Sequence, residues 1–308
     1  MGKILLFYNY TEFTYPKRIQ KWQQQICNDL GLKGRILIAK EGINGTVGGT
    51  IEAVDRYKEI IKAHPQLANT DFKESPGGAD CFPRMQVLVK DEIVHLGVPK
   101  GAHIEHTGVH LTADQTHELL NNKPEDLIVL DTRNDYEYKI GSFRDAVKPD
   151  IKSFREFPAY IDTHLDAFKD KQVLMFCTGG VRCERATAYL KEKGVAKEVY
   201  QIEGGIHRYA EKYPDGHFRG KNYVFDGRIA VPVNDDVLAE CSLCQKPCDD
   251  YTNCINAQCN KHYIACVDCV DTYNNCCSTE CQTLVAEKKV NVRTKFVKVE
   301  LDNLQKRA

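Results

Sequence analysis

The stretch that decides the fold covers residues 173–185 and reads VLMFCTGGVRCER. Its first four residues have the length and apolar composition of a buried strand, Cys177 follows directly, and a glycine-containing loop leads to a helical segment at 186–191. In such a unit the loop N–H groups point inward around the sulfur. Their dipoles, the helix N-terminus and the charge of Arg182 favour a thiolate over a thiol. The alternative is an unreactive buried cysteine beside a turn.

The surrounding residues 107–217 predict a parallel α/β domain. Thr112 and Gln115 have the spacing of a capping box at the start of a helix, and apolar runs at 127–130 and 198–202 predict further strands. Parallel sheets carry their functional groups at the carboxyl ends of the strands, and Cys177 is predicted to lie at such an end.

Residues 1–98 predict a separate α+β domain. Strands are expected at 4–8, 34–39, 45–48 and 84–90, and helices at 17–30 and 51–63, which gives the order βαββαβ of a ferredoxin-like sandwich. That fold alone says little about function. A linker is expected at 97–108, and the irregularly spaced His95, His103, His106 and His110 are interpreted as surface residues rather than as a metal site.

Composition limits the classes of protein to which the chain can belong. A length of 308 residues allows two or three domains, and no apolar run approaches the length of a membrane span. The N-terminus shows no export signal, so a cytoplasmic enzyme is expected.

Because the net charge is only −1, a nucleic-acid partner would have to bind local basic patches. The basic run at 288–298 is one candidate, and a solvated tail explains it equally well.

Fourteen cysteines are present, and ten of them fall between Cys241 and Cys281. Residues 218–308 are therefore described as a Cys-rich C-terminal region with a basic tail. Two Cys-x2-Cys pairs have the spacing of one structural tetrahedral zinc site, and four further cysteines could form a second. The alternative is a set of disulfides or free thiols. The first predicted site comprises Cys241, Cys244, Cys266 and Cys269, and the second Cys254, Cys259, Cys277 and Cys281.

Several of these motifs together resemble a rhodanese-homology domain. They are DTR at 131–133, YE at 136–137, GSF at 141–143, the loop that begins at Cys177, and EGGI at 203–206. In that family the first loop residue is a nucleophile that carries sulfur as a persulfide, and a six-residue loop is the length found in sulfur-handling members. The resemblance implies that role for Cys177.

A narrower resemblance extends over almost the whole chain. The segments GRILIAKEGINGT at 34–46, CTGGVRCE at 177–184 and NYVFD at 222–226 are similar to the oxygen-dependent tRNA uridine hydroxylases. Family members usually have Ile and Lys where Val181 and Arg185 stand here. The resemblance implies an acylphosphatase-like N-terminal domain, a rhodanese-like central domain and a Cys-rich C-terminal region. It also implies oxidation of the wobble uridine of certain tRNAs to 5-hydroxyuridine, with dioxygen as the only obligatory co-reactant and an essential Cys177.

The chemistry of the loop assigns roles to two neighbours of Cys177. Arg182 is expected to hold the loop by bonding carbonyls or a carboxylate such as that of Glu184, in preference to contacting substrate phosphate. Cys183 either resolves an oxidised Cys177 as a disulfide or packs as a small residue at the helix start. We expect the thiolate to attack C6 of uracil and so to make C5 electron-rich towards oxygen.

An anticodon loop suits such a site because its bases are splayed and can stack on aromatic rings. Tyr223 and Phe225 are the aromatic candidates. No DNA or membrane partner is expected, while the oligomeric state and the source of electrons are not set by the sequence. The expected substrate-binding residues are Thr178, Gly179, Gly180, Val181, Arg185, Arg35 and Lys40.

Two other functions fit part of the pattern. A sulfurtransferase that carries a Cys177 persulfide would use the same loop, and only the flanking segments and the N-terminal domain argue against it. A non-catalytic adaptor that binds partners through its cysteines is opposed by the intact loop.

Overall fold

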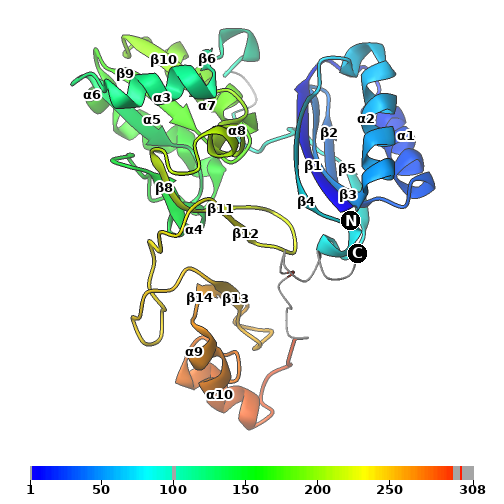
Figure 1. Ribbon diagram of the computed structural model, residues 1–308, viewed down its shortest axis with the longest axis vertical. Helices are drawn as coiled ribbons and strands as arrows, with labels where there is room; N and C mark the ends of the chain where they lie inside the picture. Colours follow the sequence, from blue (N-terminus) through cyan, green and yellow to red (C-terminus); the bar gives the residue numbers. More distant parts are fainter. Residues whose placement is uncertain (1, 99–101, 294–298, 300–308) are drawn as a thin grey trace.

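The computed structural model of the chain describes residues 2–98, 102–293 and 299. Figure 1 shows an N-terminal sheet backed by helices (blue to cyan), a central α/β lobe (green) and a small Cys-rich lobe (orange). Within the described ranges, no helix is long and apolar enough to cross a membrane. Residues 99–101 of the expected linker and 294–298 of the basic run lie outside the described residues.

The N-terminal lobe is a five-stranded sheet in the order β4-β1-β3-β2-β5, with two helices packed on one face. Side chains alternate along the strands, so Leu5 and Phe7 face the helices while Leu6 and Tyr8 face the central lobe. The first elements run β-α-β-β-α-β, which confirms the predicted ferredoxin-like fold. The elements are β1 (Gly2–Tyr10), α1 (Pro16–Asp29), β2 (Lys33–Ala39), β3 (Gly42–Thr50), α2 (Ile51–Ala63), β4 (Asp71–Gly77) and β5 (Met85–Val89).

One strand of this lobe was assigned wrongly from the sequence. The final strand of the βαββαβ unit was expected at 84–90, but that position belongs to β4. The 84–90 segment instead forms β5, a fifth strand parallel to β2. The sequence of β4, DFKESPG, is mostly polar and contains Pro76, because the strand lies at the sheet edge and pairs only with β1. Such a strand has little of the apolar periodicity by which strands are recognised.

The central lobe is a parallel sheet in the order β6-β10-β9-β7, and it confirms the predicted rhodanese-like α/β fold. Helices α5, α6 and α7 pack on one face of the sheet, and α3 and α8 pack on the other. The elements are β6 (Val109–Leu111), α3 (Ala113–Asn121), β7 (Leu127–Asp131), α4 (Asp135–Tyr138), β8 (Gly141–Phe143), α5 (Phe157–Thr163), α6 (Leu165–Phe168), β9 (Gln172–Phe176), α7 (Val181–Lys193), β10 (Glu198–Ile202) and α8 (Gly205–Lys212).

Helix α7 starts five residues earlier than the sequence suggested. It was expected at 186–191 and begins at Val181, so Arg182 and Cys183 both lie in its first turn. This places the unpaired N–H groups of the helix start next to Cys177.

The Cys-rich lobe follows the antiparallel strands β11 (Phe218–Tyr223) and β12 (Ala230–Pro232). It contains β13 (Tyr251–Asn253), β14 (His262–Ile264), α9 (Val267–Thr272) and α10 (Thr279–Ala286). Its core includes six buried cysteine side chains and extends to Ile140 and Ile229 at the base of the central lobe. None of the fourteen cysteines forms a disulfide in the structure.

A buried guanidinium joins the N-terminal and central lobes. Arg185 on α7 donates to Glu41 at 2.6 Å, to Glu92 at 3.2 Å and to the carbonyl of Val98 at 2.9 Å. The side chain of Arg185 is only 7% exposed. These ion pairs therefore fix the position of the N-terminal sheet relative to α7.

We predict that Arg185→Met lowers the stability of the chain by about 3 kcal/mol, because it leaves two partly buried carboxylates without their cation. The midpoint of thermal unfolding is the measurement. Arg56→Met is the matched control, since Arg56 pairs with Glu59 on an exposed helix face. Equal midpoints for the two variants would contradict the prediction.

Candidate active site

Cys177 lies at the carboxyl end of β9, where the chain turns sharply into α7. The N–H of Gly180 donates to the Cys177 sulfur at 3.1 Å. Gly180 has a φ of 97°, a left-handed conformation that glycine adopts without strain. Gly205 at the start of α8 approaches so closely that a Cβ there would lie 2.4 Å from the carbonyl oxygen of Cys177. The two glycines thus allow the loop to close around the sulfur.

The surroundings of Cys177 stabilise its thiolate. Burial by itself would raise the pKa of this thiol, but other contacts outweigh burial and lower the pKa to about 5. They are a hydrogen bond from the thiol of Cys183, the positive charge of Arg182, and the backbone N–H groups of Arg182 and Gly179. The pKa of Cys183 is raised well above its usual value by burial and by its donation to Cys177. One thiolate and one thiol therefore lie side by side at neutral pH.

Arg182 holds the loop through a partner that the sequence did not indicate. Its guanidinium makes two parallel bonds to Glu137 of α4, at 2.5 and 2.6 Å, and both side chains are buried. The prediction that Glu184 is the carboxylate partner of Arg182 was wrong. Glu184 instead accepts hydrogen bonds from Thr107 and Gln201. It also pairs with His110 at 2.9 Å. Arg182 thus acts as the expected structural clamp, with a different carboxylate.

Cys177 borders a cavity of about 330 Å³ between the N-terminal and central lobes, here called the Cys177 cavity. The loop supplies one side of it, and strands β1, β2 and β3 supply the other. The sequence did not identify the N-terminal lining, apart from Arg35; the alternation of β1 is the signal that could have revealed it. The lining residues are Leu6, Tyr8, Arg35, Leu37, Asn44, Gly45, Thr46, Ile93, Val94, His95, Cys177, Thr178, Gly179, Val181, Arg182 and Phe225.

Tyrosines of β1 bind the loop and its helix directly. Tyr8 donates to Glu184 at 3.0 Å, and Tyr10 donates to the carbonyl of Val181 at 3.2 Å. The active-site loop is therefore held from both sides, by Glu137 within its own lobe and by β1 of the neighbouring lobe.

The expected substrate-binding residues do not all reach this cavity. Thr178, Gly179, Val181 and Arg35 line it, and Gly180 bonds the sulfur. Arg185 does not line it, because its guanidinium is buried in the ion pairs with the N-terminal lobe.

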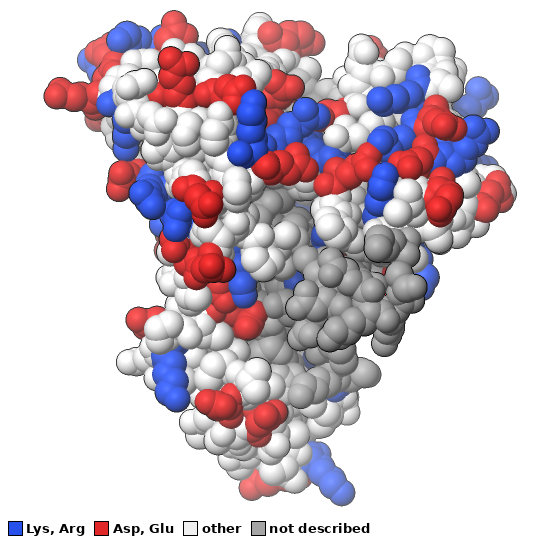
Figure 2. All heavy atoms as spheres, in the orientation of Figure 1, with Lys and Arg blue, Asp and Glu red and all other residues white. Residues whose placement is uncertain are grey.

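Three further candidates occupy different positions. Lys40 borders a separate hollow near the start of α1. Among the aromatic candidates, Phe225 is 59% exposed at the mouth of the Cys177 cavity, whereas Tyr223 packs against Tyr136 and Tyr251. On the face drawn in Figure 2, basic and acidic side chains are intermixed rather than gathered in one basic patch.

The eight predicted metal ligands form two separate clusters in the Cys-rich lobe. Within each cluster the sulfur atoms lie within 4.8 Å of one another. Tetrahedral zinc with Zn–S bonds of about 2.3 Å requires sulfur atoms about 3.8 Å apart. The pair Cys244–Cys266 measures 3.7 Å and the pair Cys259–Cys277 measures 3.5 Å. The donor sets fit structural zinc, and the clusters group the cysteines Cys241, Cys244, Cys266 and Cys269, and Cys254, Cys259, Cys277 and Cys281.

The Cys-rich lobe also contacts the element that holds the active-site loop. Tyr251 donates to the backbone carbonyl of Tyr136 at 2.9 Å, and Tyr136 immediately precedes Glu137. The ring of Tyr251 stacks on His262 of β14 with centroids 4.3 Å apart. The lobe therefore supports α4, and through it the clamp on Arg182.

Comparison with known proteins assigns a family description to each lobe. Residues 2–93 match the UPF0176 acylphosphatase like domain, 112–212 the Rhodanese-like domain, and 219–282 the Rhodanase C-terminal domain. A Corynebacterium diphtheriae protein named tRNA uridine(34) hydroxylase is 39% identical, and the alignment covers 93% of this chain and 97% of that protein. Proteins of the same name from Corynebacterium aurimucosum (40% identical, 94% and 98% covered) and Arthrobacter sp. (39%, 88% and 95%) are similar to it as well.

We predict that iodoacetamide alkylates Cys177 at a rate that is constant between pH 6.5 and 8.5 and falls as the pH drops towards 5. The reason is that a thiol with a pKa of about 5 is already ionised throughout the higher range. Arg182→Gln removes a stabilising charge, so its rate should rise with pH across that range. Mass spectrometry of the Cys177 peptide is the measurement, and Arg18→Gln on α1 is the control. A wild-type rate that climbs up to pH 8.5 would contradict the prediction.

We predict that the purified chain binds two zinc ions. Cys269→Ser and Cys281→Ser should each reduce the content by one ion, because each removes one ligand of a different cluster. Cys248→Ser and Cys276→Ser are matched controls, since these cysteines lie in the same lobe but outside both clusters. Elemental analysis measures the content. A metal-free protein that lacks reactive thiols would instead support disulfides.

Proposed function

Because the chain belongs to the tRNA uridine(34) hydroxylase family, we propose that it oxidises the wobble uridine of tRNA anticodon loops to 5-hydroxyuridine, with dioxygen as oxidant and Cys177 as nucleophile. It is a tRNA-modifying oxidoreductase with a rhodanese domain. The observation that carries the proposal is the stabilised thiolate of Cys177 at the edge of a cavity between two lobes.

In the first step the Cys177 thiolate adds to C6 of the target uracil. The electron pair of the C5–C6 double bond moves towards the C4 carbonyl oxygen and gives an enolate, so C5 becomes electron-rich. The N–H groups that stabilise the thiolate also help to align its attack, because they fix the sulfur at one position.

In the second step the electron-rich C5 reduces dioxygen and forms a C5 hydroperoxide. The thiol of Cys183 then accepts the terminal oxygen as a sulfenic acid, which leaves a hydroxyl group on C5. Loss of the C5 proton and departure of Cys177 from C6 restore the double bond and release 5-hydroxyuridine.

Condensation of the sulfenic acid with Cys177 forms a disulfide and water. In sum, uridine, dioxygen and two thiols give 5-hydroxyuridine, water and one disulfide, which an external thiol must reduce.

The clusters of cysteines have a supporting role in this proposal. Zinc bound to four thiolates is coordinatively closed and supplies structural stability rather than a reaction site. Because Tyr251 of that lobe bonds to the segment before Glu137, the metal sites would keep α4 in place.

The tRNA would reach Cys177 through the opening between the lobes. Arg35 is an exposed cation on the lining of the Cys177 cavity and is the best-placed residue of the expected set to contact an RNA phosphate. Phe225 at the same opening offers an exposed ring on which a base can stack.

Sulfur transfer is the competing chemistry because it needs the same loop. The N-terminal lobe favours hydroxylation, since β1, β2 and β3 close one side of the cavity around Cys177 and leave space for a planar base. The near full-length similarity to proteins named as hydroxylases favours the same reading.

We predict that Cys177→Ser reduces 5-hydroxyuridine in tRNA to background, because a serine hydroxyl is not ionised at neutral pH and cannot add to C6. Product from the wild-type enzyme should require dioxygen. The measurement is mass spectrometry of nucleosides from tRNA incubated with purified protein and a thiol, with or without oxygen. Cys27→Ala, in the core of the N-terminal lobe, is the control and should retain activity within about twofold. Product formation by Cys177→Ser, or thiocyanate formation from thiosulfate and cyanide without tRNA oxidation, would refute the proposal.

A further inference from the structure

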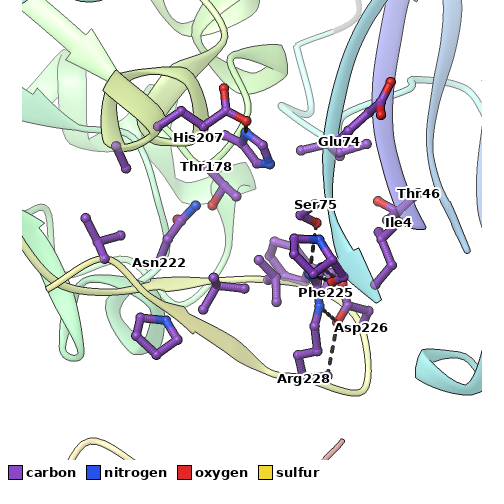
Figure 3. A pocket seen from close by; sticks show the side chains of 18 of the residues that line it. Ile4, Thr46, Glu74, Ser75, Thr178, His207, Asn222, Phe225, Asp226 and Arg228 are labelled. Carbon is purple, nitrogen blue, oxygen red and sulfur yellow. Dashed lines mark hydrogen bonds and ion pairs between the residues drawn. The ribbon is translucent and has the colours of Figure 1, made fainter. Parts of the chain in front are cut away.

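A second cavity of about 330 Å³ lies beside the Cys177 cavity and has no part in the chemistry described above. The two cavities share Leu6, Thr46, Thr178 and Phe225 as a common boundary. Figure 3 shows the second cavity between strands of the N-terminal sheet on one side and Thr178, His207 and Asn222 of the central lobe on the other. Cys177 does not line it, so the target base cannot react there.

Most charged groups around this second cavity already have partners. Arg228 pairs with Asp226 at 2.5 Å and donates to the hydroxyl of Ser75 at 2.9 Å. Glu74 pairs with Lys3 at 2.9 Å. The bond from Arg228 to Ser75 joins the β11–β12 segment to the N-terminal sheet. The ion pairs neutralise Arg228, Asp226 and Glu74, so these three side chains offer no free charge to a ligand.

Asn222 differs from these residues. It lies on β11, is only 4% exposed, and its side-chain oxygen accepts no hydrogen bond from any residue that the structure describes. Buried polar atoms in folded proteins nearly always have a partner, and a side chain that lacks one is commonly completed by a ligand or water. In Figure 3 the amide end of Asn222 lies beside Thr178, at the boundary between the two cavities. An amide offers one acceptor and two donors in a plane, which matches the polar edge of a nucleobase.

The remaining lining suits a flat, largely apolar ring. Ile4, Pro76, Val224 and Val231 supply apolar surface, and the ring of Phe225 stands at the boundary with the Cys177 cavity. Aromatic faces bind single-stranded bases of any identity by stacking, and hydrogen bonds to the base edge then add selectivity.

We propose that the second cavity binds the nucleobase adjacent to the target uridine in the anticodon loop, with Phe225 between the two bases and Asn222 bonded to the edge of the neighbour. This inference rests on the proposed function. Consecutive nucleotides are joined by a single phosphodiester, so a uridine that enters the Cys177 cavity brings its neighbour to the adjoining space. A base bound there would supply the missing hydrogen-bond partner of the Asn222 amide. It would also fix the register of the anticodon loop, so that the correct uridine lies next to the Cys177 thiolate.

The test uses anticodon stem-loop RNAs in which the nucleotide 5′ or 3′ of the target uridine is abasic. Binding to full-length Cys177→Ser protein is measured by fluorescence anisotropy, and hydroxylation by the wild-type enzyme is measured in parallel. One of the two abasic RNAs should bind about tenfold more weakly than the intact loop, as expected for the loss of one stacked base. Adding Asn222→Leu to the Cys177→Ser protein should weaken binding of the intact loop by a similar factor. In that double variant, the intact loop and the abasic RNA should bind with nearly equal affinity.

Asn28→Leu on the exposed face of α1 is the matched control and should bind like the parent. If Asn222→Leu does not fold, Val231→Trp fills the same cavity and should give the same loss of discrimination. An unchanged affinity for both abasic RNAs, or an equal penalty with and without Asn222, would overturn the inference. Displacement of the RNA by micromolar free nucleoside monophosphates would also overturn it, because the second cavity would then be a binding site for free nucleotides rather than for a base of the anticodon loop.

The outcomes separate this inference from the proposed function. If the wild-type enzyme forms no 5-hydroxyuridine on the intact loop, the proposed function fails. If it forms the product equally well on both abasic RNAs, the function stands and only the second base site is excluded.

Discussion

The paired bonds between Arg182 and Glu137 are the contact on which the active site depends. Arg182 stands in the first turn of α7, five residues after Cys177, so its position sets the path of the loop between them. Its charge also lowers the pKa of the Cys177 thiol. Because both partners are buried, loss of either would leave an uncompensated charge in a site of low dielectric constant. The Cys-rich lobe reaches the same contact through Tyr251 and the backbone before Glu137.

A second constraint comes from the N-terminal sheet, which completes a site that the rhodanese-like lobe leaves open. One face of β1 packs on helices, and the opposite face contacts the start of α7, directly after the Cys177 loop, through Tyr8 and Tyr10. The Arg185 ion pairs hold this arrangement from the side of α7. The proposed function therefore requires both lobes. The loop supplies the reactive sulfur, whereas the sheet gives the cavity the shape and the apolar surface that a base requires.

The chemistry of the loop does not by itself choose between sulfur transfer and hydroxylation, since both begin from the same thiolate. Two features beyond the loop favour a reaction on a nucleobase: the cavity between the loop and the N-terminal sheet, and the buried thiol of Cys183 beside Cys177. The thiol matters because hydroxylation by dioxygen requires two electrons that uridine does not supply. A neighbouring thiol can provide them without a metal or an organic cofactor, provided that an external thiol restores it.

Local patterns in the sequence were enough to identify the fold class, the strand–loop–helix unit that carries Cys177 and the grouping of the C-terminal cysteines, because strand length, loop glycines and Cys-x2-Cys spacing are properties of short segments. The tertiary structure alone decided the contacts between distant segments. Arg182 and Glu184 are two residues apart on one helix and cannot face each other, so the clamp is made by Glu137, 45 residues away. Arg185 became buried for a similar reason, and the edge strand β4 was missed because its stability comes from pairing with β1. Asn222 likewise could not be predicted as a ligand-binding residue, because only the fold places β11 and the N-terminal sheet around the same cavity. Spacing along a chain fixes local chemistry, but the identity of a partner depends on which surfaces the fold brings together.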